Sequence, residues 1–176
     1  MISLVKFNNE LNELITFLVE SEWPFHAEVA VSEKDIRKAV LEKWYEDGRE
    51  TFWVIRADQI CGLLIIHDIE DTIPLFDLRL AESCRGHGIG SEVLEWLKTY
   101  LFDRPNPKVR IEAYTRVDNI GMRKAFTRSG FVKEGYLRNA WESDNGEVYD
   151  AFCYAATLED WKNGTIRSIR IDEEPY

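Results

Sequence analysis

The sequence is poor in the residues that build disulfide or metal frameworks. It contains only three cysteines, Cys61, Cys84 and Cys153, and no two of them form a Cys-x-x-Cys pair. An odd, scattered set of cysteines argues against a disulfide or zinc framework and is typical of a chain kept in a reducing compartment. We therefore expect no metal site and a cytoplasmic location, with the cysteines acting as small apolar fillers.

Long apolar runs are also missing. No stretch approaches the roughly 20 consecutive apolar residues that a membrane span needs, and residues 1–7 resemble a short strand rather than a signal peptide. Hydrophobic residues still make up 45% of the 176 residues, which is enough for one core of this size. Internal repeats and low-complexity segments are absent. These features predict a single globular domain that does not bind membranes.

Positive charge is scarce and gathered in one block. The net charge is −10, yet residues 85–138 hold 11 Lys and Arg against 6 Asp and Glu. Residues 1–50 hold 6 against 11, and residues 139–176 hold 3 against 9. An acidic chain repels nucleic acid, whereas a basic block attracts a phosphorylated ligand. The acidic flanks either favour a cationic partner or are solvated surface.

The basic block begins with a glycine-rich loop, Arg-Gly-His-Gly-Ile-Gly at 85–90. A strand-like run at 73–80 precedes it, and a run with helical periodicity at 91–101 follows it. Glycines at the start of a helix allow a phosphate to approach the unpaired N–H groups there. The alternative is a tight turn that needs positive φ angles.

Two common phosphate-binding motifs do not match this loop. A Walker loop ends in Gly-Lys-Ser/Thr, which is absent here. A dinucleotide fingerprint has the spacing Gly-x-Gly-x-x-Gly, and here the third glycine comes one residue too early. A nucleotide-binding module is therefore disfavoured.

The hydrophobic pattern predicts an α/β fold with one mixed sheet of about seven strands and about four helices. The strands are expected to pair in an antiparallel manner early in the chain and in parallel at the centre of the sheet. Expected strands are 2–7, 51–56, 60–66, 73–80, 109–114, 131–137 and 148–156, and expected helices are 8–20, 32–48, 91–101 and 120–128. Residues 1–161 would form the domain, and residues 162–176 a polar tail.

A second motif favours a phosphate-binding role for the glycine loop over a simple tight turn. Residues 119–131 resemble the pattern Asn-x-x-Ala/Ser-x-x-x-Tyr-x-x-x-Gly-Phe of the GNAT superfamily of N-acetyltransferases, and the loop at 85–90 resembles that family's Arg/Gln-x-x-Gly-x-Gly. The expected order of elements is similar to the GNAT fold over residues 1–161. Residues 130–138 and the turn at 144–146 resemble the branch that acetylates the N-termini of ribosomal proteins.

The resemblance implies acetyl-CoA as cosubstrate and names the residues that would hold it. The pantetheine arm would pair with the backbone of a strand whose next neighbour splays away, and Asn119 would contact the pantetheine or its water. Arg123 and Lys124 would each reach a phosphate or else lie on a solvated helix face. The expected cofactor-binding residues are Leu78, Arg79, Leu80, Arg85, Gly86, His87, Gly88, Ile89, Gly90, Ser91, Asn119 and Arg123.

The resemblance also implies a carboxylate base for the acceptor amine. Asp77 is the preferred candidate and Glu112 the alternative, since both are charges in otherwise apolar strands. The family's usual tyrosine proton donor corresponds to Phe126, which has no proton to give. This departure keeps open a non-catalytic acyl-CoA-binding or regulatory protein as the alternative to an enzyme.

The acceptor is expected to be a primary amine, either a small cationic molecule or a protein N-terminus, in a monomer or homodimer. The segment after the first helix lies where the family binds its substrate. Trp23, Phe25, His26 and Trp141 are the expected substrate-binding residues. His26 would bind substrate, transfer a proton or only form a hydrogen bond at the surface.

Overall fold

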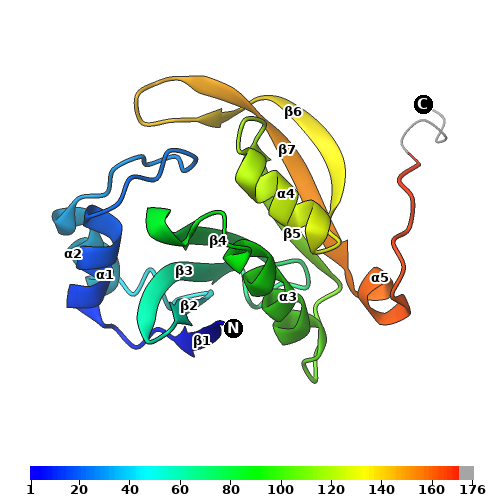
Figure 1. The fold of residues 1–176 in the computed structure, drawn as a ribbon, viewed down its shortest axis with the longest axis horizontal. Coiled ribbons are helices and arrows are strands. Elements are labelled where there is room, and N and C mark those ends of the chain that lie inside the picture. The colour runs from blue at the N-terminus through cyan, green and yellow to red at the C-terminus, as the bar shows by residue number, and fades with distance from the viewer. Residues whose placement is uncertain (171–176) are drawn as a thin grey trace.

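The computed structural model describes residues 1–170, so the end of the predicted tail, 171–176, lies outside the described residues. One seven-stranded sheet has the order β1-β2-β3-β4-β5-β7-β6 (Figure 1). All neighbouring strands are antiparallel except β4 and β5, which are parallel. The predicted mixed sheet is confirmed. The strands are β1 (Ser3–Lys6), β2 (Arg49–Arg56), β3 (Gln59–His67), β4 (Leu75–Leu80), β5 (Arg110–Arg116), β6 (Val132–Glu142) and β7 (Val148–Thr157).

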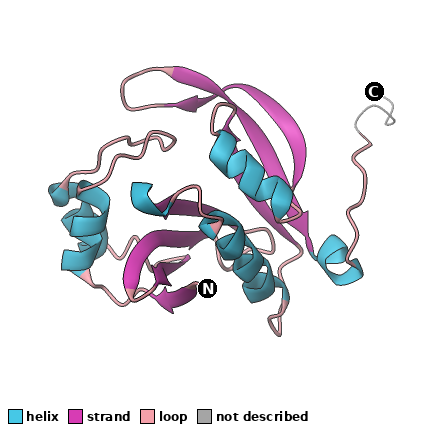
Figure 2. Ribbon diagram, in the orientation of Figure 1, coloured by secondary structure: helices cyan, strands magenta, loops and turns pink. Residues whose placement is uncertain are grey.

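Five α-helices and a 3₁₀ turn accompany the sheet (Figure 2), one helix more than expected. The unexpected helix is α5, which spans the expected domain boundary at 161. Its N-terminus is capped by Thr157, whose hydroxyl accepts a hydrogen bond from the Asp160 N–H at 3.1 Å. No helix within residues 1–170 is long and apolar enough to cross a membrane. The helices are α1 (Leu11–Val19), α2 (Glu33–Leu41), α3 (Ile89–Phe102), α4 (Ile120–Arg128), α5 (Leu158–Asn163) and η1 (Glu82–Cys84).

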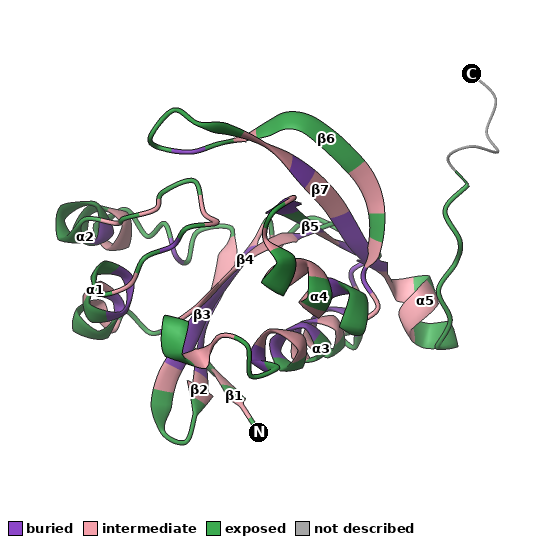
Figure 3. Ribbon diagram, turned by 45° about the horizontal axis from the view of Figure 1, so that its top comes forward, coloured by how far each residue is buried: buried purple, intermediate pink, exposed green. Residues whose placement is uncertain are grey.

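Alternating side chains on β2 and β3 pack into two separate hydrophobic cores, one on each face of the sheet. Phe52 and Leu64 belong to the core beneath α3 and α4, whereas Trp53 and Leu63 belong to the core beneath α1 and α2. Because successive side chains of a strand point to opposite faces, a fully apolar strand requires cover on both sides. Figure 3 shows this burial in the middle strands and on the inner faces of the helices.

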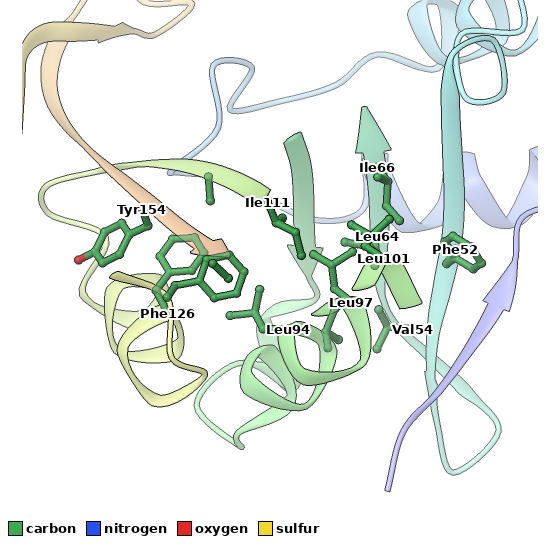
Figure 4. Packing of buried hydrophobic residues seen from close by; sticks show 14 of the residues in the cluster. Phe52, Val54, Leu64, Ile66, Leu94, Leu97, Leu101, Ile111, Phe126 and Tyr154 are labelled. Atoms are coloured by element: carbon green, nitrogen blue, oxygen red, sulfur yellow. The ribbon is translucent and has the colours of Figure 1, made fainter. Parts of the chain in front are cut away.

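Phe126 occupies the core between α4 and the sheet. Its ring is 2% exposed and stacks on Tyr154 with centroids 4.7 Å apart (Figure 4). Phe131 contacts the same ring at 5.4 Å. Such aromatic contacts favour a purely apolar ring at this position, so its packing accounts for a phenylalanine there.

The sheet opens between its two parallel strands. β4 pairs with β3 along six positions, from Gly62↔Leu80 to His67↔Leu75, but β4 pairs with β5 only at Leu75↔Glu112. The strands therefore separate after one pair, as the resemblance implies. From residue 76 to 80 the edge of β4 that faces β5 has no strand partner within the described chain. The Leu80 carbonyl accepts a hydrogen bond from Arg85 Nε at 2.9 Å, and the other backbone groups of this edge are available to a ligand.

Gly62 keeps β4 in this position. A Cβ at Gly62 would lie 2.6 Å from the Arg79 carbonyl oxygen, whereas a Cβ at Gly121 in α4 would have only the Asn119 Oδ1, at 3.8 Å, nearby. We expect Gly62→Ala to lower the free energy of unfolding by about 1–3 kcal/mol, because a backbone atom must move. Urea unfolding of both variants tests this, with Gly121→Ala as the control that should lose no stability. Equal stabilities of the two variants would contradict it.

Candidate active site

Two cavities meet at the opening between β4 and β5. The first, here called the loop cavity, has a volume of about 470 Å³ and runs along the glycine loop and α4. The second, here called the Asp77 cavity, has a volume of about 400 Å³ and lies over β4 and β5. Where they join, both are lined by Phe25, His26, Leu78, Asn119 and Met122.

The glycine loop forms one wall of the loop cavity. Gly86 and Gly88 both have φ of +80°, and no atom lies within 4 Å of where a Cβ would sit. The turn thus needs glycine and also leaves open space before the N-terminus of α3, whose first N–H groups lack helical partners. Arg85, Gly86, Gly88, Gly90 and Ser91 line the cavity.

Two residues of this loop that were expected to bind the cofactor do not line either cavity. His87 is exposed, and Ile89 is 1% exposed within the core. The first turn of α3 directs Ile89 inward, because a helix that covers a sheet must bury one stripe. Neither side chain therefore lines a cavity, and a role of these two residues in binding the cofactor stays a prediction.

The basic residues of α4 differ in whether they line a cavity. Arg123 donates to the Val117 carbonyl at 2.6 Å and lies 4.9 Å above the Phe152 ring, so it lines neither cavity, contrary to prediction. Lys124 and Arg128 line the loop cavity instead. These two are four residues apart and share one helical face. Lys124 was expected to reach a phosphate, whereas Arg128 was not, and the spacing from Lys124 was the signal in the sequence that would have found Arg128.

Asn119 begins this helix at the junction of the cavities. Its Oδ1 accepts a hydrogen bond from the Met122 N–H at 3.1 Å and caps α4. The amide NH₂ group keeps its donor capacity. The expected position of Asn119 beside the ligand agrees with its place in both cavity walls.

Asp77 is held by an imidazole and a guanidinium. His26 Nε2 lies 2.9 Å from Asp77 Oδ1, and Arg79 Nε lies 3.3 Å from Asp77 Oδ2. Burial alone would raise the pKa of the Asp77 carboxyl, but His26 and Arg79 together lower that pKa well below its usual range. The carboxylate is therefore ionised at neutral pH, and each of its oxygens already has a partner.

The alternative carboxylate, Glu112, lines neither cavity. Arg110 Nε lies 2.8 Å from its Oε1, and the Tyr114 hydroxyl donates to its Oε2 at 3.2 Å. Burial, followed by the nearby Cys153 and Glu112, raises the pKa of Tyr114 to about 12. Glu112 thus takes part in a network on the sheet, and only Tyr114 of this network reaches the Asp77 cavity.

His26 lies on a segment here called the strap, residues 21–32 between α1 and α2. Three contacts tie it to distant parts of the chain: Arg85 Nη2 donates to the Glu22 carbonyl at 3.0 Å, Arg116 Nη1 to the Pro24 carbonyl at 3.1 Å, and the Asp144 N–H to the Ala27 carbonyl at 3.0 Å. The strap therefore reaches across the opening to the β6–β7 hairpin (Figure 1). These anchors hold Phe25 and His26 over the junction.

The four expected substrate-binding residues are not equivalent. Trp23 is 1% exposed, donates to the Leu18 carbonyl at 2.9 Å and lines the loop cavity, so its assignment to the acceptor was wrong. Arg79 and Arg85 lie 5.5 and 5.7 Å above its ring and occupy its faces. Trp141 does line the Asp77 cavity, and its Nε1 is buried without a partner among the described residues.

His67 also lines the Asp77 cavity, although no partner for it is visible in the sequence. Its Nδ1 accepts a hydrogen bond from Arg49 Nε at 3.1 Å, which leaves Nε2 as the protonated nitrogen. Burial lowers the pKa of His67. Its register on β3 beside β4 brings it there, a pairing that local sequence does not reveal.

The arrangement suits a long phosphorylated ligand that carries amides. A glycine loop, a helix N-terminus and three cationic side chains line one end, and the unpaired edge of β4 can hydrogen-bond to amides. Within residues 1–170, His, Cys, Asp and Glu nowhere form a group of three that could hold a metal.

Comparison with known proteins identifies the family. The model of the acetyltransferase (GNAT) family matches residues 15–131. The ribosomal-protein-serine acetyltransferase of Escherichia coli (strain K12) is 29% identical over 150 residues, which cover 82% of this chain and 81% of that protein.

Solved structures share the fold at low sequence identity. A chimera of the spermidine N-acetyltransferase SpeG from Vibrio cholerae and hSSAT has a TM-score of 0.79 at 18% identity, and 92% of this chain covers 98% of that one. The ribosomal L7/L12 α-N-protein acetyltransferase RimL in complex with coenzyme A has a TM-score of 0.74 at 22% identity, with coverage of 89% and 93%. With the family match over most of its length, this chain belongs to the GNAT family of acetyl-CoA-dependent acetyltransferases.

Proposed function

We propose that this protein transfers the acetyl group of acetyl-CoA to a primary amine, either a small cationic molecule or a protein N-terminus, by direct attack of the amine on the thioester. The observation that carries this proposal is the meeting of two cavities at the opening between β4 and β5. One chain supplies both cavities, and a monomer or a homodimer remains the expected assembly.

The loop cavity is proposed to hold coenzyme A. Gly86, Gly88 and Ser91 would receive the pyrophosphate, and Lys124 and Arg128 would neutralise its charge and that of the adenosine phosphate. The backbone of β4 at 78–80 would pair with the pantetheine amides. The thioester would then lie at the junction beside His26 and Asn119.

A bulky residue in the loop should block the pyrophosphate. We expect Gly88→Val to weaken acetyl-CoA binding at least tenfold, about 1.4 kcal/mol, as measured by calorimetry. Because Gly88 has φ of +80°, valine also strains the backbone. Gly164→Val is the matched control, since Gly164 has φ of +63° with open space around it and lies at the end of α5. Equal affinities in the two folded variants would contradict the loop assignment.

Asp77 is proposed as the carboxylate on which amine deprotonation depends. An alkylammonium titrates near pH 10.4, so a neutral amine near pH 7 costs about 4–5 kcal/mol, and a base must meet part of this cost. We expect Asp77→Asn to lower kcat at least tenfold with little change in acetyl-CoA affinity. Glu112→Gln is the matched comparison. If Glu112→Gln lost activity and Asp77→Asn kept it, the base would be Glu112.

The acceptor is proposed to be cationic or a protein N-terminus in a basic setting. Glu28 and Asp77 line the Asp77 cavity together with Arg79, while the chain as a whole has a net charge of −10. The long-range field of the protein therefore attracts cations, and the cavity adds only a weak local preference. A relative acts on a ribosomal protein, as its name states, and a structural neighbour acts on spermidine.

We expect kcat/KM to favour cationic over anionic amines, and we expect salt to reduce this preference because it screens the field. The measurement is kcat/KM for a matched cationic and anionic amine from 20 to 500 mM salt, read as free CoA released. A preference for the anionic amine, or selectivity independent of salt, would show that the acidic surface does not select the substrate.

A non-catalytic acyl-CoA-binding protein is the second candidate, because Phe126 replaces the usual tyrosine acid and is buried by stacking on Tyr154. The same assay separates the two. Release of CoA that depends on the amine supports the enzyme, whereas binding of acetyl-CoA without turnover over a broad amine panel supports the second candidate.

A further inference from the structure

The junction of the two cavities carries an imidazole poised between the two proposed reactants. His26 lines both cavities, whereas Asp77 lines only the Asp77 cavity, where the acceptor is proposed to bind. Its Nε2 faces Asp77 Oδ1 at 2.9 Å, and its Nδ1 is buried and has no partner among the described residues. Burying a ring nitrogen without a hydrogen-bond partner costs free energy, unless a ligand supplies that partner.

We infer that His26 takes the proton from the attacking amine and returns it to the leaving sulfur, while Asp77 acts on the reaction by positioning His26. This inference rests on the proposed acetyl transfer. Asp77 Oδ1 and Oδ2 each have one partner, His26 and Arg79, and these partners stabilise the ionised carboxylate so strongly that it is a weak base. The free atom of the pair is His26 Nδ1.

The hydrogen bond to Asp77 selects the required tautomer. With the proton on Nε2 donated to the carboxylate, Nδ1 keeps a lone pair and can accept a proton. The carboxylate then stabilises the imidazolium that forms, as in other pairs of an imidazole and a carboxylate. The strap anchors described above and the contact of His26 with the Trp23 ring, with centroids 6.0 Å apart, hold the imidazole in place.

The proton balance of the step is complete. The ammonium form of the acceptor first gives one proton to solvent, and the amine binds in its neutral form. The neutral amine nitrogen attacks the thioester carbonyl, a C–N bond forms, and Nδ1 takes one proton from that nitrogen. The C–S bond then breaks, and the imidazolium gives this proton to the thiolate, so that CoA leaves as the free thiol and His26 returns to its neutral form. No further acid is needed, which removes the difficulty created by Phe126.

Several charged or titratable groups surround His26 and affect any pH profile. The groups that line the Asp77 cavity or contact the strap are Glu28, His67, Asp77, Arg79, Arg85, Tyr114 and Arg116. Among them His67 is the only other imidazole and has its Nδ1 bonded to Arg49 at 3.1 Å. It therefore provides the matched control for a histidine in the same cavity.

The test is the pH dependence of kcat between pH 5 and 9 with saturating acetyl-CoA and amine, because kcat reports groups in the enzyme–substrate complex. Wild-type kcat should fall at low pH, where imidazoles gain a proton. His26→Gln keeps a donor for Asp77 but has no base, so kcat should fall about 100-fold and the decrease at low pH should disappear. His67→Gln should retain that decrease whatever its maximal rate.

Asp77→Asn separates the two possible bases. If His26 is the base, this variant keeps a low-pH decrease but at lower pH, because the imidazolium has lost its carboxylate partner. If Asp77 takes the proton itself, Asp77→Asn abolishes the decrease and His26→Gln retains it, which would overturn the inference.

A second measurement does not depend on turnover. In ¹⁵N NMR of the free protein at pH 8, His26 should be the neutral tautomer with its proton on Nε2. A proton on Nδ1 would overturn the inference. An amine panel that gives no turnover while NMR gives the expected tautomer would refute the proposed function and leave the imidazole–carboxylate pair intact.

Discussion

The site depends on one structural constraint, the separation of the parallel strands β4 and β5 after a single pair. Interior strands normally satisfy both edges, and an unpaired buried edge is costly. Here β4 is satisfied on its β3 side only, from residue 75 to residue 80, and its other edge faces two cavities. A ligand that carries amides can form hydrogen bonds with this edge, so the opening provides a place where the cosubstrate of the family can bind.

The remaining features hold that opening in a defined shape. Gly62 lets β4 approach β3 closely, and Phe126 fills the space between α4 and the sheet. The strap crosses the opening and is tied by arginines from both sides, Arg85 before α3 and Arg116 on β5. Arg85, which was a candidate for ligand binding, therefore also builds the wall of the site. A guanidinium can do both, since it has five donors.

The electrostatics of the site differ from those of the whole chain. The protein is acidic, yet Asp77 in the cavity is balanced by His26 and Arg79. Trp23 and Phe25 were attractive candidates for cation–π contacts with a substrate, but Arg85 lies 5.7 Å above Trp23 and Arg116 lies 5.5 Å above Phe25. These two rings therefore already have a cationic partner within the chain.

The sequence by itself determined the order of the elements, the mixed sheet and the position of the glycine loop, because periodicity, caps and glycine spacing are local properties of the chain. It also selected Asp77 and His26 separately. Only the tertiary structure decided that these two form a pair, that Arg123 turns away while Lys124 and Arg128 face the cavity, and that Glu112 is held elsewhere by Arg110. These facts depend on contacts between residues as many as 51 positions apart, and strand register and the path of the strap bring such residues together.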